Sequence, residues 1–161
     1  MKNLLFVFIF LLGTFGVSQA QDYNSAVGLR IGYPLSISYK TFLNETAAAE
    51  AYVGYRSFFG YKEFRVNAAY LIHNEIENVE RLKWYYGGGA GVAFYSYNSF
   101  YLEDTGGIGL TLSGYLGLEY TLDGTPISFS LDWVPTFVIG GVSGFGASNG
   151  ALAIRYVLNQ E

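Results

Sequence analysis

The single histidine is the first residue whose chemistry has to be considered. His73 lies two positions before Glu75, and an imidazole beside a carboxylate can act as a general base. One histidine cannot build a histidine-based metal cluster, and the chain has no cysteine. We weigh catalysis by His73 against a simpler interpretation, in which it is a polar residue at the end of a strand.

Two acidic residues form a second candidate. Glu119 and Asp132 fall in neighbouring predicted strands, and paired carboxylates can serve as acid and base. Ion pairing with Arg155 and Arg56 is the interpretation we prefer. The glycine-rich run 87–91 is not a phosphate loop, because the Lys-Ser/Thr ending and the following helix are missing. We therefore assign no catalytic, metal-binding or cofactor-binding residue, and we expect no enzyme activity.

Strands must position these residues, because the surrounding pattern alternates. In residues 110–120 every second position is large and apolar apart from Gly114, and polar residues such as Thr111 and Glu119 lie between them. A period of two predicts a strand with one apolar face. The opposite face is too small and glycine-rich to suit water, but it suits a narrow interior. We therefore expect the leucine row to face lipid.

The composition supports a membrane barrel rather than a soluble domain. Charged residues make up 14% of the chain, against about 25% in soluble domains. Aromatic residues make up 19%, and there are 21 glycines. Without cysteine, the fold must be held by strand pairing and packing.

The first residues predict export. Residues 1–20 form a signal peptide, with Lys2, an apolar run over 4–15, and small residues before a cleavage site at Gln21. The apolar run is shorter than the ~20 residues of a spanning helix. The mature domain would be 21–161, with 8 basic and 13 acidic residues once Lys2 is removed. That acidic balance argues against nucleic acid as a partner.

Eight segments show the alternation of strands. They cover residues 26–33, 35–42, 47–57, 64–73, 82–95, 110–120, 127–137 and 151–158. Predicted loops at 58–63, 97–107 and 140–150 follow the third, fifth and seventh strands, and the turns after the second and sixth are short. Outer-membrane barrels place short turns in the periplasm, so both termini are expected there. The turn at 74–81 is long for that side.

The mid-strand charges fall on the face that carries glycine and serine. We predict a lumen charge network of Arg30, Lys40, Glu50, Arg56, Glu119, Asp132 and Arg155. A lipid-facing Arg or Lys at mid-depth costs ~2–4 kcal/mol, whereas inside the barrel these groups can pair. Since the interior of an eight-stranded barrel only has room for side chains, we expect a plugged lumen. On the outer face we predict four interface aromatics: Trp84, Tyr86, Trp133 and Tyr156.

At this point the chain resembles the small OmpA/OmpX-type outer-membrane β-barrels, most of all uncharacterised Bacteroidetes-type members. The resemblance is carried by residues 28–33, 84–91, 130–135 and 152–158, which read GLRIGY, WYYGGGAG, SLDWVP and LAIRYVL. It implies an all-β fold, an eight-stranded antiparallel up-and-down transmembrane β-barrel in the outer membrane of a Gram-negative cell. It also implies insertion machinery that reads the last strand. Ile154, Tyr156 and Leu158 keep the alternation of that strand, although the chain does not end in an aromatic residue.

The resemblance does not extend to lipid A deacylases of this architecture. Those enzymes use Ser, His and an acid, with the Ser two positions after the His on the same strand face. Here that position is Glu75, so the pattern fails at His73.

We expect a non-enzymatic monomer whose partners are outer-membrane lipid and the barrel-insertion machinery. Its loops would carry a structural or surface-interaction role. The loop aromatics either line a ligand-binding rim or extend the hairpins; they are Phe58, Phe59, Tyr61, Phe100 and Tyr101. Three alternatives stay open: a lipid A-modifying enzyme, a narrow pore, and a secreted lipocalin-like binder. The last would need the leucine row of 110–120 inside.

Overall fold

The computed structural model describes residues 23–32, 34–99, 102–140 and 143–159. Within these ranges there is no helix of the length and apolarity that a membrane-crossing helix requires. The expected signal peptide, residues 1–20, lies outside the described residues, as do Phe100 and Tyr101.

Ten strand segments in the described chain form one closed antiparallel barrel. They are β1 (Ser25–Gly32), β2 (Leu35–Phe42), β3 (Ala47–Phe58), β4 (Tyr61–Glu75), β5 (Leu82–Ser99), β6 (Leu102–Thr121), β7 (Ile127–Trp133), β8 (Thr136–Ile139), β9 (Gly144–Gly146) and β10 (Gly150–Asn159). The sheet closes through pairing of β5 with β6. Segments β7 and β8 both pair with β6 and follow one another along it. They form one barrel strand, and β9 with β10 forms the next, so the barrel has eight strands, as predicted.

Proline divides the seventh barrel strand. The alternation in 127–137 predicts one continuous strand, but the structure interrupts it at Val134 and Pro135. Proline has no N–H to donate to a neighbouring strand. The barrel stays closed because Val134 N donates to Asn149 O at 2.8 Å, and Gly114 N donates to Pro135 O at 2.9 Å.

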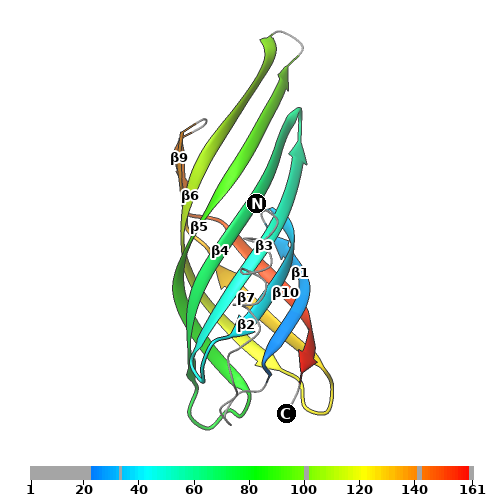
Figure 1. Ribbon diagram of the computed structural model, residues 1–161, viewed down its shortest axis with the longest axis vertical. Helices are drawn as coiled ribbons and strands as arrows, with labels where there is room; N and C mark the ends of the chain where they lie inside the picture. The colour runs from blue at the N-terminus through cyan, green and yellow to red at the C-terminus, as the bar shows by residue number, and fades with distance from the viewer. Residues whose placement is uncertain (1–22, 33, 100–101, 141–142, 160–161) are drawn as a thin grey trace, which may run out of the picture.

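Two of the predicted loops are wrong, because the strands continue through them. The third and fourth strands pair as far as Phe58 and Tyr61, and β5 and β6 extend to Ser99 and Leu102. Phe59 and Gly60 have φ values of 40° and 82°, as in the two-residue turns that match strand twist. Both hairpins rise above the rest of the barrel at the end opposite the C-terminus (Figure 1). The predicted loop 140–150 likewise contains β9.

The register fixes the tilt of the strands. We start at Leu29 and step from each residue to its paired residue on the next strand. In one direction around the barrel these steps end at Val92 of β5, and in the other direction they end at Leu82 of β5. The sheet thus closes with a displacement of ten residues along β5. Such a stagger tilts the strands by ~35–45°. Two residues that share the inner face can therefore lie at very different heights in the lumen.

The exterior of this barrel is apolar and the interior polar. Leu110, Leu112 and Leu118 are 58%, 51% and 45% exposed, whereas Thr111 and Glu119 between them are buried. This is the orientation predicted for residues 110–120. The pleat of β6 produces the alternation, since successive side chains point to opposite faces of the sheet.

Within the described residues, two small clusters of buried apolar side chains lie inside the barrel. Tyr52, Leu71, Tyr85 and Tyr115 belong to one of them, in the middle of the lumen. Near the ends of the chain, Tyr23 packs edge-on against Phe42, with ring centroids 5.1 Å apart. Outside these clusters most buried side chains of the described residues are polar or charged, with small apolar ones such as Ala93 and Ala153 among them.

Candidate functional site

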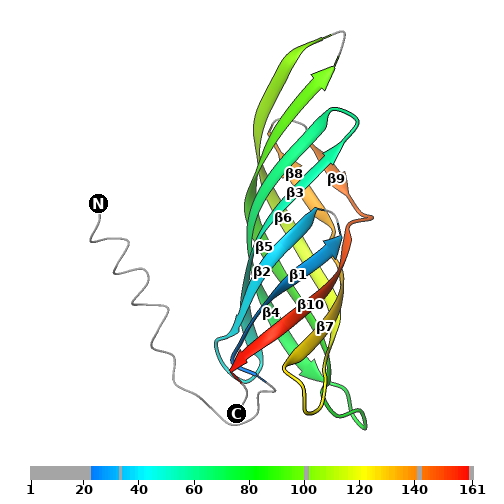
Figure 2. The same ribbon diagram turned by 90° about the vertical axis from the view of Figure 1, so that its right-hand side faces the viewer.

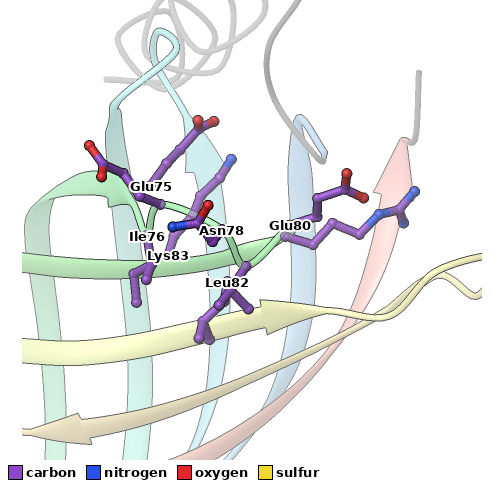
Figure 3. A pocket seen from close by; sticks show the side chains of 9 residues that line it. Glu75, Ile76, Asn78, Glu80, Leu82 and Lys83 are labelled. Carbon is purple, nitrogen blue, oxygen red and sulfur yellow. The ribbon is translucent and has the colours of Figure 1, made fainter.

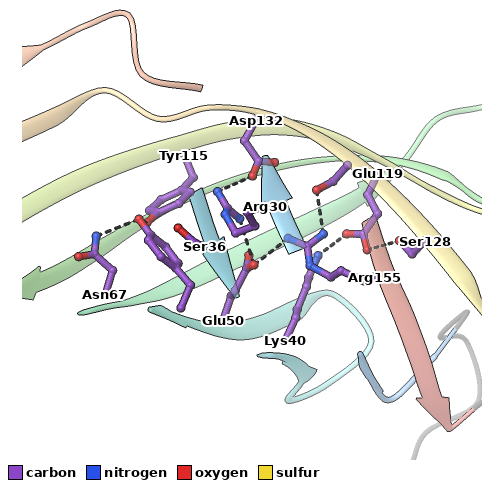
Figure 4. Close-up of polar contacts among 12 residues, drawn as sticks. Arg30, Ser36, Lys40, Glu50, Asn67, Tyr115, Glu119, Ser128, Asp132 and Arg155 are labelled. Carbon is purple, nitrogen blue, oxygen red and sulfur yellow. Dashed lines mark hydrogen bonds and ion pairs between the residues drawn. The ribbon is translucent and has the colours of Figure 1, made fainter. Parts of the chain in front are cut away.

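The lumen holds a balanced network of buried charges, which we call the central network. Its members come from six strand segments and are each 3% exposed or less: Arg30, Lys40, Arg155, Glu50, Glu119 and Asp132. Three cations face three carboxylates. Figure 4 shows them pointing toward one another from opposite walls of the barrel.

Glu50 lies at the centre of this network. Its Oε1 is 3.0 Å from Arg30 Nη1 and 2.7 Å from Arg155 Nη2. Arg30 also reaches Asp132, with Nη2 to Oδ2 at 2.6 Å, and Arg155 Nη1 donates to Ser130 Oγ at 2.8 Å. These contacts connect β1, β3, β7 and β10 across the lumen.

A second carboxylate organises the end of the lumen near the C-terminus. Glu119 forms an ion pair with Lys40 and accepts hydrogen bonds from the hydroxyl groups of Tyr23 and Ser128, the latter at 2.8 Å. His73 Nε2 lies 3.3 Å from Glu119 and 2.8 Å from Lys40 Nζ. Tyr23, which precedes β1, is therefore buried inside this end of the barrel.

The structure does not assemble the catalytic pairs considered above. His73 is 2% exposed, and its carboxylate partner is Glu119 on β6, whereas Glu75 is exposed. Glu119 and Asp132 are held by different cations, Lys40 and Arg30. The described residues also contain no group of three or more His, Cys, Asp and Glu that could hold a metal.

A layer of neutral polar groups lies next to the central network. Tyr52 and Tyr115 join through their hydroxyl oxygens at 2.9 Å, and Asn67 Nδ2 donates to Tyr52 at 3.0 Å. Thr111 Oγ1 then donates to Asn67 Oδ1 at 3.0 Å. The Arg30 guanidinium lies 4.9 Å from the centre of the Tyr52 ring, which links the two layers.

Arg56 does not join the central network, although the sequence predicts it there. It is on the same face of β3 as Glu50 but six residues further along the strand, and its side chain is 26% exposed. Its ion-pair partner is Glu63, at 3.8 Å, which also pairs with Arg65. We call Arg56, Glu63 and Arg65 the upper cluster.

Sequence reasoning missed several members of these networks. Glu63 falls in a segment predicted as a loop, and Tyr23 precedes the first alternating segment, so periodicity carried no signal for either. Arg65 and His73 share the inward phase of β4. Both alternate with outward apolar residues, and this alternation could have predicted that they belong to the charged interior.

The longest turn at the end near the C-terminus forms an open hollow. Residues 75–83 line about 580 Å³, and Figure 3 shows Ile76 and Leu82 pointing one way and the carboxylates of Glu75 and Glu80 the other. A neighbouring hollow of about 510 Å³ is bounded by residues that include Glu45, His73 and Lys83. The second hollow reaches the edge of the central network through His73, which contacts Lys40 and Glu119.

All four predicted interface aromatics point outward. Trp84, Tyr86, Trp133 and Tyr156 are 39%, 45%, 51% and 57% exposed. Trp84 stacks on Tyr86 with centroids 5.6 Å apart, and Trp133 Nε1 donates to Ala147 O at 2.6 Å. Their depth in a membrane stays a prediction.

Comparison with known proteins identifies the fold. No family model matches the chain, and no curated protein matches it significantly. Among solved structures, the crystal structure of Neisserial surface protein A is similar, with a TM-score of 0.53 over 83% of this chain and 93% of that chain, at 12% identity. At this identity the similarity shows the fold alone: the chain is a closed eight-stranded antiparallel β-barrel of the same architecture.

Proposed function

We propose that this protein is an integral outer-membrane β-barrel with a plugged polar lumen. It is exported by the signal peptide in residues 1–20, inserted by the barrel-insertion machinery, and acts as a monomer. Its role is structural or is a surface interaction made by the hairpins opposite the termini. This is the OmpA/OmpX-type arrangement that the sequence resembles.

This proposal rests on the distribution of side chains, which is the reverse of that in a soluble protein: apolar outside and charged inside. Apolar side chains such as Leu29, Ile37 and Leu131 are 53%, 62% and 61% exposed, and the central network is sealed within. Exposed apolar patches larger than a few hundred Å² are rare in soluble monomers. In a bilayer the same surface is favourable, because the strands of a closed barrel pair their backbone groups with one another and the outer face contacts hydrocarbon.

The two long hairpins support a role at the cell surface. Phe58 and Phe59 at the tip of one hairpin are 60% and 88% exposed, with ring centroids 4.5 Å apart. The similar solved structure is of a protein named for the surface. Exposed aromatic side chains provide a large contact area at a small cost in side-chain entropy.

The contacts of His73 favour a non-enzymatic role over lipid A modification. Ser128 and His73 bind the same carboxylate, Glu119, instead of one another, so His73 does not activate that hydroxyl group. Incubation of the purified barrel with lipid A should leave the acyl content unchanged. Loss of an acyl chain would instead support the enzyme alternative.

The two tryptophans test the membrane location at two depths. Trp84 is the third residue of β5 and Trp133 the seventh of β7, counted from strand ends at the same side of the barrel. With a rise of ~3.3 Å per residue and a tilt of about 40°, they lie ~5 Å and ~15 Å above that side. In an apolar band ~25 Å tall, Trp84 is near the edge, where the sequence predicts an interface aromatic. On the same count Trp133 is near the middle, which differs from the interface position that the sequence predicts for it.

Single-tryptophan variants, Trp133→Phe and Trp84→Phe, reconstituted in bilayers of brominated lipids, should show this difference. We expect bromines deep in the acyl chains to quench Trp133 most, and bromines near the glycerol to quench Trp84 most. A soluble tryptophan analogue in the buffer is the control for quenching without insertion. Quenching of both tryptophans by aqueous iodide alone would show that the barrel is not in the bilayer.

A further inference from the structure

The wall of the barrel is much lower on one side than on the other. Strands β1 and β2 contain eight residues each, and with a rise of ~3.3 Å per residue and a tilt of about 40° they span only ~18 Å along the axis. Figure 2 shows their tops far below the two long hairpins. On the other side, Phe94 of β5 and Ile108 of β6 point outward and are 44% and 62% exposed. By the same count the apolar exterior there reaches ~30 Å.

The connection between β1 and β2 fixes the height of the low side. Only two residues separate Gly32, the last of β1, from Leu35, the first of β2, so the chain has no length to rise further. We call Gly32, Pro34 and Leu35 the low rim. Leu35 pairs with Tyr55 of β3, and β3 continues upward without a partner in β2. In an apolar band ~25 Å tall, the low rim ends ~7 Å below the upper edge of the band.

Polar groups lie directly behind and above the low rim. Pro34 and Arg65 line the same small cavity, and Arg65 forms an ion pair with Glu63 inside the barrel. Above Tyr55, the edge of β3 presents backbone groups that β2 does not pair. Charged side chains and open sheet edges are both unfavourable in hydrocarbon. Acyl chains that passed over the low rim would contact both.

Thinning of the bilayer avoids this contact. A bilayer adapts to a short apolar span by thinning locally, and the cost per ångström is modest. The exterior of the low side stays apolar up to the rim, since Ile31 and Leu35 are 53% and 57% exposed. Lipid can therefore cover these strands as far as the low rim without meeting a polar group. The headgroups are then expected at the level of the low rim.

We propose that the leaflet on the side of the long hairpins is thinned beside β1 and β2. Its headgroup layer descends by ~7 Å there and fills the space above the low rim, while the leaflet keeps its full thickness beside β5 and β6. The low side of the barrel is thus an interaction surface for lipid headgroups. This inference rests on the proposed membrane location.

The depths of single tryptophans in brominated bilayers test the proposal. The variants start from a barrel with Trp84→Phe and Trp133→Phe. Leu35→Trp places an indole at the low rim, and Ala90→Trp places one on the outer face of β5 at nearly the same height, ~20 Å against ~18 Å. We expect bromines near the glycerol to quench Leu35→Trp most, and bromines further down the acyl chains to quench Ala90→Trp most. In a flat bilayer both would report the same depth.

A second pair of tryptophans near the lower edge separates thinning from a tilt of the whole barrel. Tyr39→Trp on β2 and the original Trp84 on β5, each as the single tryptophan, lie ~8 Å and ~5 Å above the lower side. Since thinning affects only the opposite leaflet, the same bromines should quench both. A tilted barrel that raised Leu35→Trp would also move Tyr39→Trp deeper into the bilayer than Trp84, and this result would overturn the proposal.

Raising the low rim should remove the difference in depth. A Val-Ser insertion after Gly32 and another before Leu35 keep the alternation and raise the rim by ~5 Å. The headgroups then move up, and Leu35→Trp should be quenched by the same bromines as Ala90→Trp. If the lengthened barrel does not fold, the comparison in the original barrel decides.

Two results with the original barrel would contradict the proposal. One is an equal depth for Leu35→Trp and Ala90→Trp. The other is the quenching of Leu35→Trp by neither set of bromines, which would show that a protein chain covers the low side. If Ala90→Trp is quenched by brominated lipid in either case, only this inference fails. If no tryptophan is quenched by brominated lipid, the membrane location fails as well.

Discussion

At the scale of single residues, the buried ion pairs of the interior tolerate the loss of both partners better than the loss of one. Arg155 is fully buried and touches Glu50 and Ser130. Replacing both members of a buried ion pair with apolar residues is often tolerated, whereas removing one member leaves an uncompensated charge. The network therefore adds little net stability as a whole, although the loss of one partner is costly.

Arg155→Leu should lower the heat resistance of the folded barrel. The change leaves Glu50 with Arg30 alone, and breaking a buried pair in this way costs ~3–5 kcal/mol. We expect the folded band on a gel to convert to the unfolded band at a lower temperature.

Arg81→Leu is the matched control for this change. Arg81 pairs with Asp123 at 2.7 Å, but the two side chains are 38% and 83% exposed, and such a pair contributes ~0–1 kcal/mol. The double variant Arg155→Leu with Glu50→Leu should recover part of the loss. Unchanged resistance in Arg155→Leu alone would show that the pair does not stabilise the fold.

At the scale of elements, the glycine run in β5 has two different sides. A Cβ atom on Gly91 would lie 1.9 Å from Asn67 Oδ1 and 2.2 Å from Val66 O, whereas the nearest atom to a Cβ on Gly88 is Ser113 O at 3.9 Å. The inward glycines, such as Gly91, leave room for the side chains of Asn67 and Tyr115. The outward Gly88 faces open space. A strand with ordinary side chains on both faces would not fit here.

Gly91→Ala and Gly88→Ala should therefore have opposite effects on stability. Gly91→Ala forces the backbone and Asn67 apart, and overpacking of this kind costs ~1–3 kcal/mol. Gly88→Ala should be neutral or stabilise by ~0.4–1 kcal/mol, because it restricts the unfolded chain. Urea midpoints of the barrel in detergent measure both. Equal midpoints would contradict the geometry of β5.

At the scale of the whole molecule, the layers of side chains close the lumen. The central network, the layer around Tyr52 and Tyr115 and the upper cluster follow one another along the axis. The cavity between Arg30 and Arg65 is only about 10 Å³, which is room for about one water molecule. We therefore expect no continuous water path through the part of the barrel that the structure describes.

The barrel should therefore show no channel activity. In a planar bilayer under an applied voltage, we expect no regular conductance steps from purified protein. An open porin in the same chamber is the positive control. Uniform single-channel steps that Arg30→Ala enlarges would show that the pore alternative holds.

The sequence by itself determined which side chains share a face. A period of two in residues 110–120, and in the other seven segments, was enough to predict the barrel, the lipid-facing rows and the inward charges. It could not place the strand ends, because the hairpins at Phe59–Gly60 and beyond Tyr97 are built from residues that also suit loops. It gave no sign that Tyr23, before the first strand, would enter the lumen.

Only the tertiary structure decided which charges meet. Alternation assigns Arg56 and Glu50 to the same face, but it says nothing about their height. The ten-residue displacement on closure sets that height, and it brings Arg155 of the last strand beside Glu50 of the third while Arg56 pairs with Glu63 near the rim. Contacts across a barrel depend on the register of all eight strands together, and no single segment of the sequence contains that information.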